Sequence, residues 1–325
     1  MSKKIKNLCV SVALAAVVGI SAAASACTMK SKHPTARITI QFNEVNYEID
    51  YTLYRNMYPQ TVQHFIELAD AGFYNEIIVH DYKTTDWVSG GYSYNAKQEE
   101  TDDAGNASMV ASNYDESYSR TGGMLEYLEA NSKEKEYYEL VTKGIKDGTF
   151  SASVYEKSIY VGEEEAVSID NALPTVIGEF SNNNHKIKDD KGLTASYGTL
   201  KMVYYTKDVK DHVVVTNSFN QILECDYAYN CATSLFAMQV SNGASSYDAS
   251  KYAVFGQLKN DKSKDNLEKL TDKIQDYVTS LGSSTKWTTS IETQVDKEDK
   301  YADVDQKFAM TVKPIVIKSV KIIKH

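Results

Sequence analysis

The chain has 325 residues and a formal net charge of −9, a length that suits one large or two small domains with a sizeable core. The acidic balance argues against a nucleic-acid binder, because such a protein needs a cationic surface to displace phosphate counterions. After residue 27 no apolar segment of the sequence is long enough to span a bilayer.

Residues 1–26 have the composition of an export signal. Lysines at positions 3, 4 and 6 precede an apolar run, and the small residues at positions 24–26 precede Cys27. This end resembles the bacterial lipobox, in which the cysteine is acylated and becomes the mature N-terminus, although Ala24 stands where the lipobox usually has Leu. We expect an exported lipoprotein on the outer face of the bacterial cell membrane, anchored through Cys27 and a tether of residues 27–35. Plain secretion and an uncleaved anchor are the alternatives.

Signal removal deletes three lysines and changes the formal charge from −9 to −12. Cys9 leaves with the signal, so Cys225 and Cys231 remain in the mature domain. Outside the cytoplasm these two thiols can form a disulfide, or they are separate small apolar residues, and the sequence leaves both alternatives open. No Cys-x-x-Cys pair or zinc spacing occurs, so the sequence predicts neither a metal nor a cofactor.

The N-terminal half of the domain alternates between strand and helix patterns. Apolar residues at every second position of 36–54 predict a β-hairpin that turns at Asn43-Glu44. Residues 59–72 predict a helix that Gly72 ends, and 76–82 and 86–92 predict strands. The polar, Tyr-rich residues 93–172 have the composition of an insertion with one helix, over 124–145.

The C-terminal half has a similar pattern. Strands are expected over 197–205, 234–240, 251–258 and 313–323, with a second polar insertion at 206–228. A helix is expected over 264–282, with a capping box of Asp265 and Glu268 and an end at Gly282. Many short strands with two isolated helices predict a mainly β protein, a closed antiparallel barrel with a helix at each open end.

The amino-acid sequences of these segments and their order resemble those of the cyclophilin family of peptidyl-prolyl cis-trans isomerases. Residues 54–80 are similar to the family's strand–helix–strand opening, with Gly72-Phe73-Tyr74 at the family's interval and His80 where the family has Phe-His-Arg. Gly90-Gly91 stands where the family has Gln-Gly-Gly. Further matches follow in family order at 177–180, 198–202, 231–236, 252–258 and 313–320.

The resemblance implies an eight-stranded barrel over residues 36–325 that binds proline-containing peptide segments of exported client proteins. An X–Pro bond isomerises slowly because amide resonance imposes a barrier of about 18–20 kcal/mol. An isomerase stabilises the twisted amide electrostatically, without a covalent step. In the family an Arg donates to the prolyl nitrogen, an apolar pocket holds the proline ring, and Gln and Asn side chains hold the peptide.

The sequence departs from the family at most of these positions. Asp81 replaces the catalytic Arg, so no catalytic residue is secure, and Leu235 and Ala237 replace a backbone-holding Gln and a pocket Phe. The loop Trp and His of the family fall near Tyr247 and on Tyr252. The peptide-groove candidates are therefore Asp86, Trp87, Ser89, Tyr204, Leu235, Phe236, Ala237 and Tyr252.

Two further side chains bear on activity. Arg120, or Lys83, is a candidate replacement for the missing cation, and His80 is expected to be a buried structural histidine rather than a catalytic or metal-binding one. We therefore expect an isomerase-like lipoprotein with weak or absent activity. The alternatives are a non-catalytic peptide-binding module, whose groove Trp87, Tyr204 and Tyr252 line, and a surface interaction protein that binds through its insertions.

Overall fold

The structure is a computed structural model of the whole chain. It describes residues 31–94, 97–101, 107–111, 128, 131–158, 167–168, 173–187, 192–204, 212–216, 222–226, 231–247, 252–292 and 307–325. The expected signal peptide, Cys27 and Arg120 lie outside these ranges. In the ranges given, no helix has the length and apolar character needed to cross a bilayer.

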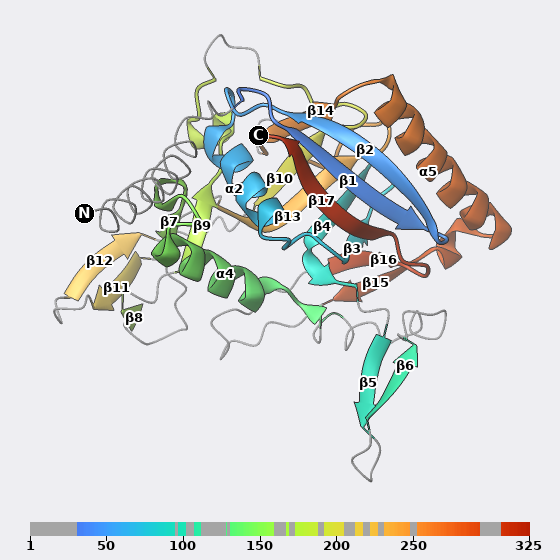
Figure 1. Cartoon of the computed structure of the whole chain (residues 1–325), viewed down its shortest axis with the longest axis horizontal. Helices are drawn as coiled ribbons and strands as arrows, with labels where there is room; N and C mark the ends of the chain where they lie inside the picture. Colours follow the sequence, from blue (N-terminus) through green and yellow to red (C-terminus); the bar gives the residue numbers. More distant parts are fainter. Residues whose placement is uncertain are drawn as a thin grey trace, which may run out of the picture.

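Eight strands close into an antiparallel barrel (Figure 1). Each strand pairs antiparallel with its two neighbours in the ring. The ring closes through the pairing of the first and last strands in the order given below. This confirms the predicted mainly β, eight-stranded closed barrel. The order around the ring is β10 (Leu200–Tyr204), β14 (Val254–Leu258), β2 (Val45–Leu53), β1 (Thr35–Phe42), β17 (Val316–Lys324), β3 (Ile77–Tyr82), β4 (Asp86–Ser93) and β13 (Cys231–Gln239).

The first hairpin follows directly from the local sequence. Strands β1 and β2 pair without a register shift from Thr35 to Phe42, and the turn lies at Asn43 and Glu44 as predicted. Both turn residues have positive φ, 52° and 65°, which is the conformation that matches the twist of a two-residue hairpin. The alternating pattern therefore places Ile38 and Ile40 in the core on one face of β1.

Two helices lie on either side of the barrel, α2 (Pro59–Asp70) and α5 (Asp261–Ser280) (Figure 1). Helix α2 begins with Pro59, whose missing N–H is not needed in the first turn. Helix α5 begins earlier than expected, because the side chain of Asn260 caps it by accepting from Ser263 N at 2.9 Å. The predicted capping box of Asp265 and Glu268 is therefore wrong, since both residues lie inside the helix.

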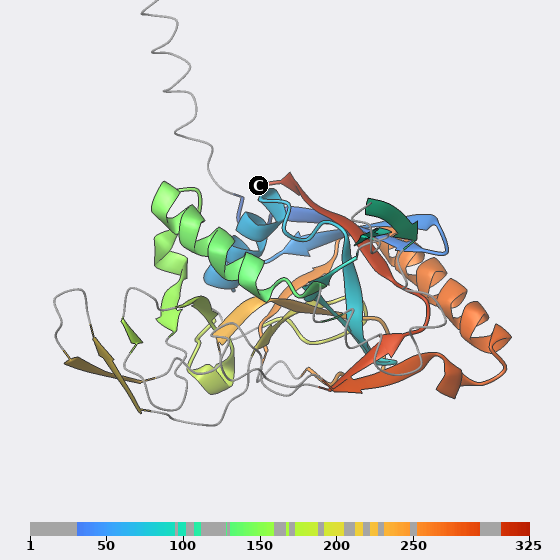
Figure 2. The same cartoon turned by 90° about the horizontal axis from the view of Figure 1, so that it is seen from below.

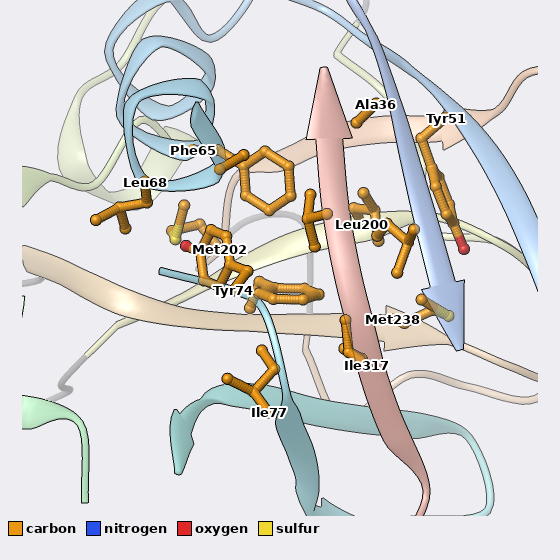
Figure 3. Close-up of a cluster of buried hydrophobic side chains, with 14 of the residues drawn as sticks. Ala36, Tyr51, Phe65, Leu68, Tyr74, Ile77, Leu200, Met202, Met238 and Ile317 are labelled. Carbon is orange, nitrogen blue, oxygen red and sulfur yellow. The ribbon is translucent and has the colours of Figure 1, made fainter. Parts of the chain in front are cut away.

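The interior of the barrel is a continuous aromatic and aliphatic core. Figure 3 shows Phe65 of α2 among buried side chains of the barrel, with Tyr74, Leu200 and Met202 near it. The Phe65 ring packs edge-on against Phe236, with centroids 5.5 Å apart. Because α2 contributes to the same core as the strands, its position relative to the sheet is fixed by packing.

Elements outside the ring occupy both predicted insertions and the C-terminal region (Figure 2). Helix α4 (Glu134–Asp147) buries Tyr137 and Val141 in the main core, so this part of the first insertion is integral to the domain. The other elements are β5 (Lys97–Thr101), β6 (Ala107–Ala111), η2 (Ala152–Val154), β7 (Glu156–Ser158), β8 (Val167–Ser168), β9 (Leu173–Ile177), η4 (Ser181–Asn183), β11 (His212–Thr216), β12 (Ile222–Asp226), η5 (Ser284–Lys286), β15 (Thr288–Glu292) and β16 (Lys307–Thr311). Strands β9 and β7 extend the sheet from β13.

Candidate functional site

Strands β4 and β13 approach each other closely at Gly90. The φ of Gly90 is 104°, and a Cβ at this position would lie 2.2 Å from the Ser234 carbonyl oxygen. The Ser234 hydroxyl donates to the Gly90 carbonyl at 2.8 Å, and the Tyr74 hydroxyl donates to the Ser234 carbonyl at 3.0 Å. Three of the segments that resembled the family are thus joined at one point, and only glycine fits there.

His80 is fully buried on the outer side of β3. Its ring packs edge-on against Tyr92 and Phe308, with centroid distances of 4.8 and 5.2 Å. Burial lowers the pKa of His80 to about 4, so the imidazole is neutral at neutral pH. No group of three or more His, Cys, Asp or Glu side chains suited to a metal occurs among the residues that the structure describes. These contacts agree with the expected structural role of His80.

Asp81 is held by the hairpin of β15 and β16. A register shift in the pairing of β3 with β4 lies between Val79 and Asp81. The Asp81 carboxylate accepts a hydrogen bond from the backbone N–H of Ala309 in β16 at 3.0 Å. Lys83 Nζ lies 3.3 Å from the other carboxylate oxygen, and only 9% of the Asp81 side chain is exposed. The Asp81 carboxylate therefore already holds two partners, one on β16 and one on Lys83.

Asp86 forms a buried ion pair that the sequence did not predict. Lys201 Nζ lies 2.9 Å from Asp86 Oδ1, with both side chains at 0% exposure. The same ammonium donates to Gln239 Oε1 at 2.9 Å and to the Ser245 hydroxyl. Asp86 also accepts from Ser246 N at 3.1 Å. The pair thus fixes the loop of residues 241–247 to the sheet.

Four further predicted groove residues on β4 and β13 are buried. Trp87 and Phe236 point into the barrel core, where Trp87 stacks on Tyr82 with centroids 5.9 Å apart. Ser89 and Leu235 are also buried, at 1% and 8% exposure. Successive strand residues face opposite sides of the sheet. Val88 and Ala237, which follow Trp87 and Phe236 in their strands, therefore face outward.

The outer face of β4 and β13 carries a small apolar cluster, which we call the outer patch: Val88, Ala237 and Tyr247, with Val203 and Tyr252 partly buried beside them. Tyr247 lies only 7% exposed over this face, and its ring packs edge-on against Tyr252 at 5.0 Å. Lys83 Nζ lies 5.0 Å from the centre of the Tyr247 ring. Ala237 is thus packed in the same cluster as Tyr247, whose ring lies over this face of the sheet.

Several predicted residues remain untested. Arg120 and the side chains of Tyr204, Cys225 and Cys231 lie outside the described residues, so the rescuing cation and the disulfide stay predictions. Sequence reasoning missed Lys201, whose only signal was a lysine inside the apolar strand segment "GTLKMVYY". A lysine amid apolar strand residues is a candidate for a buried charge that needs a partner.

The ring of strands and its two helices define a cyclophilin-like fold. The sequence profile of the family described as "Cyclophilin type peptidyl-prolyl cis-trans isomerase/CLD" matches residues 37–293. The chain therefore belongs to the cyclophilin-type peptidyl-prolyl isomerase family. The match ends before β17, yet this strand completes the ring by pairing with β1 and β3.

Solved structures that resemble the chain are also cyclophilins. The Mimivirus cyclophilin is 14% identical, with a TM-score of 0.32, over 74% of this chain and 78% of that one. A Cryptosporidium parvum cyclophilin type isomerase is 12% identical, with a TM-score of 0.33, over 90% of this chain and 99% of that one. A structure of the latter in the presence of the dipeptide Ala-Pro gives a TM-score of 0.32 at the same identity and coverage. No curated protein matches.

Proposed function

We propose that the chain is an exported, membrane-tethered lipoprotein whose cyclophilin domain has weak or no isomerase activity. The observation that carries this proposal is the state of Asp81, which bonds the Ala309 N–H at the position of the family's Arg. A twisted prolyl amide needs a hydrogen-bond donor at its nitrogen. An ionised carboxylate only accepts, so it cannot supply this donor.

Lys83 is a poor substitute for the missing cation. Its ammonium lies 3.3 Å from Asp81 and within 3.4 Å of the Tyr247 hydroxyl. Catalysis would require this group to leave an existing ion pair and to reach a substrate on a surface that Tyr247 covers. Positioning and donor act together in such a reaction, so both losses lower the rate.

A second candidate function is non-catalytic binding of proline-containing segments of exported proteins. The outer patch favours it, because this apolar cluster lies on the face that binds peptide in the family, with the partly exposed Tyr252 beside it. Aromatic grooves recognise proline-rich segments without any chemistry. In this case the partner would displace Tyr247 from the outer patch.

The decisive measurement is isomerisation of a proline-containing peptide by the 28–325 fragment, with an active cyclophilin as positive control. We expect a rate near the uncatalysed background. Peptide binding is measured separately by fluorescence anisotropy, and binding without catalysis would favour the second candidate. A robust isomerisation rate would contradict the loss of activity.

The third hypothesis is that the protein binds its partner through the insertions. A deletion that tests this hypothesis has to be shorter than the whole first insertion. Deleting 93–172 would remove α4, whose Tyr137 and Val141 belong to the main core. Replacing residues 95–127 by a Gly-Ser linker spares α4. If this variant still captures the partner, that segment is not the interaction surface.

A further inference from the structure

The C-terminal strand is basic in an otherwise acidic protein. Residues 307–325 contain five lysines and no Asp or Glu, although the chain as a whole has a net charge of −9. At the end of β17, Lys321 and Lys324 are exposed, and Ile323 is one of the few large apolar residues exposed to solvent among those described, at 46%. Lys321 and Ile323 are two positions apart and so share the outward face of the strand.

This end of β17 is fixed beside the start of the described chain (Figure 2). The backbone N–H of Ser31 donates to the His325 carbonyl at 3.1 Å. The Arg55 side chain donates to the Ser31 carbonyl at 2.9 Å. Lys32, which is exposed, therefore lies next to the basic end of β17. We call Lys32, Lys321, Ile323 and Lys324 the basic tip.

The basic tip lies within a short reach of the expected anchor. Cys27 precedes Ser31 by four residues, which span at most about 14 Å when fully extended. If Cys27 carries lipid, as proposed above, Ser31 and the His325 carbonyl that it bonds lie within about this distance of the bilayer surface. A Debye length in physiological salt is about 8 Å, so charges on the tip are within range of a charged membrane surface.

We propose that the basic tip binds the headgroups of anionic phospholipids and orients the barrel on the membrane. The tip contributes three lysines. Among the acidic side chains nearby, Asp70 lies 3.7 Å from the His325 ring, and Glu48 lies 3.0 Å from Arg37, the residue opposite Lys321 in the β1–β17 pairing. Arg37, on the adjacent strand, is already paired with Asp50 at 2.7 Å. Each basic residue near an anionic surface strengthens binding by about fivefold, and exposed Ile323 adds an apolar contact.

The test uses the 28–325 fragment, which lacks both signal and lipid and retains residues 31–325, where all the contacts described above lie. Binding to vesicles of phosphatidylglycerol and of phosphatidylcholine is measured by co-sedimentation. We expect binding to the anionic vesicles alone, lost in high salt, and weakened about tenfold or more by Lys321→Glu with Lys324→Glu. The matched control, Lys262→Glu with Lys269→Glu on exposed positions of α5, makes the same charge change away from the tip.

The outcomes separate the tip from the anchor. The proposal would be overturned if both double variants weakened vesicle binding equally, or if the folded fragment did not bind anionic vesicles. It would also be overturned if the fragment bound only an anionic cell-wall polymer. Circular dichroism confirms that each variant is folded. Acylation of Cys27 is measured independently, by mass spectrometry of the protein from membranes. An unmodified Cys27 together with vesicle binding would refute the lipid anchor and leave the tip intact.

Discussion

The Lys201 ammonium lies 2.9 Å from the Asp86 carboxylate, and neither side chain is exposed to solvent. Burial lowers the pKa of Lys201, while its hydrogen bond to Asp86 opposes that change. The ammonium has three acceptors, on Asp86, Gln239 and Ser245, which matches its three protons. The pair holds the loop that carries Tyr247 across the outer patch.

Lys201→Met should destabilise the domain by about 3–5 kcal/mol, because it leaves the Asp86 charge buried without its partner. The measurement is urea denaturation at pH 7. The double variant Lys201→Met with Asp86→Leu should recover most of the loss, since it removes both charges. A double variant as unstable as the single one would show that the network has a role beyond charge compensation.

Asp81→Ala should lower the free energy of unfolding by about 1–2 kcal/mol, because the partly buried Ala309 N–H loses its acceptor. Asp81→Asn, which keeps an acceptor oxygen, is the matched control and should lose less. Asp81→Arg should remain near background in the peptide isomerisation assay. This variant still carries Ala237 and the other residues that differ from the family at the expected pocket positions. A large gain of activity would mean that the cation alone was missing.

Tyr247→Ala should open the outer patch, because no other side chain of the 241–247 loop belongs to that cluster. The loss of a buried aromatic should cost about 2–3 kcal/mol, and binding of a hydrophobic dye or a proline-containing peptide should increase. Tyr247→Phe keeps the ring and should behave like the wild type. Unchanged dye and peptide binding by Tyr247→Ala would contradict the covering role of this side chain.

Acidification should destabilise the domain through its two buried histidines. The pKa of His64 and of His80 is lowered from 6.5 to about 4, in both cases mainly by burial. Their contribution to stability is therefore fully present above pH 6.5 and is lost as the pH falls toward 4. Each contributes a slope of up to about 1.4 kcal/mol per pH unit in this window.

The pH effect is measured by urea denaturation between pH 7.5 and 4.5. His64→Gln should flatten the slope, even though it also loses the bond to the Thr233 carbonyl at 2.7 Å. Identical slopes in wild type and His64→Gln would show that His64 does not titrate with unfolding.

Local sequence was sufficient where neighbours in the chain are neighbours in space. The Asn43-Glu44 turn, the apolar face of α2 and the alternation of apolar residues in the strands could all be predicted. Hydrophobic periodicity and turn conformation depend on only a few adjacent residues. The start of α5 was missed, since the cap of Asn260 competes with a plausible box five residues further on. The motif around His80 predicted both its burial and the place of Asp81 in the family register.

What the sequence by itself determined was therefore the family and the barrel, and it predicted an Asp at position 81, where the resemblance places the family's catalytic Arg. Only the tertiary structure decided what Asp81 and Asp86 do instead. Their partners, Ala309 and Lys201, lie 228 and 115 residues away in the chain. No periodicity links such positions, because closure of the barrel and the docking of β16 bring them together through packing of the whole domain.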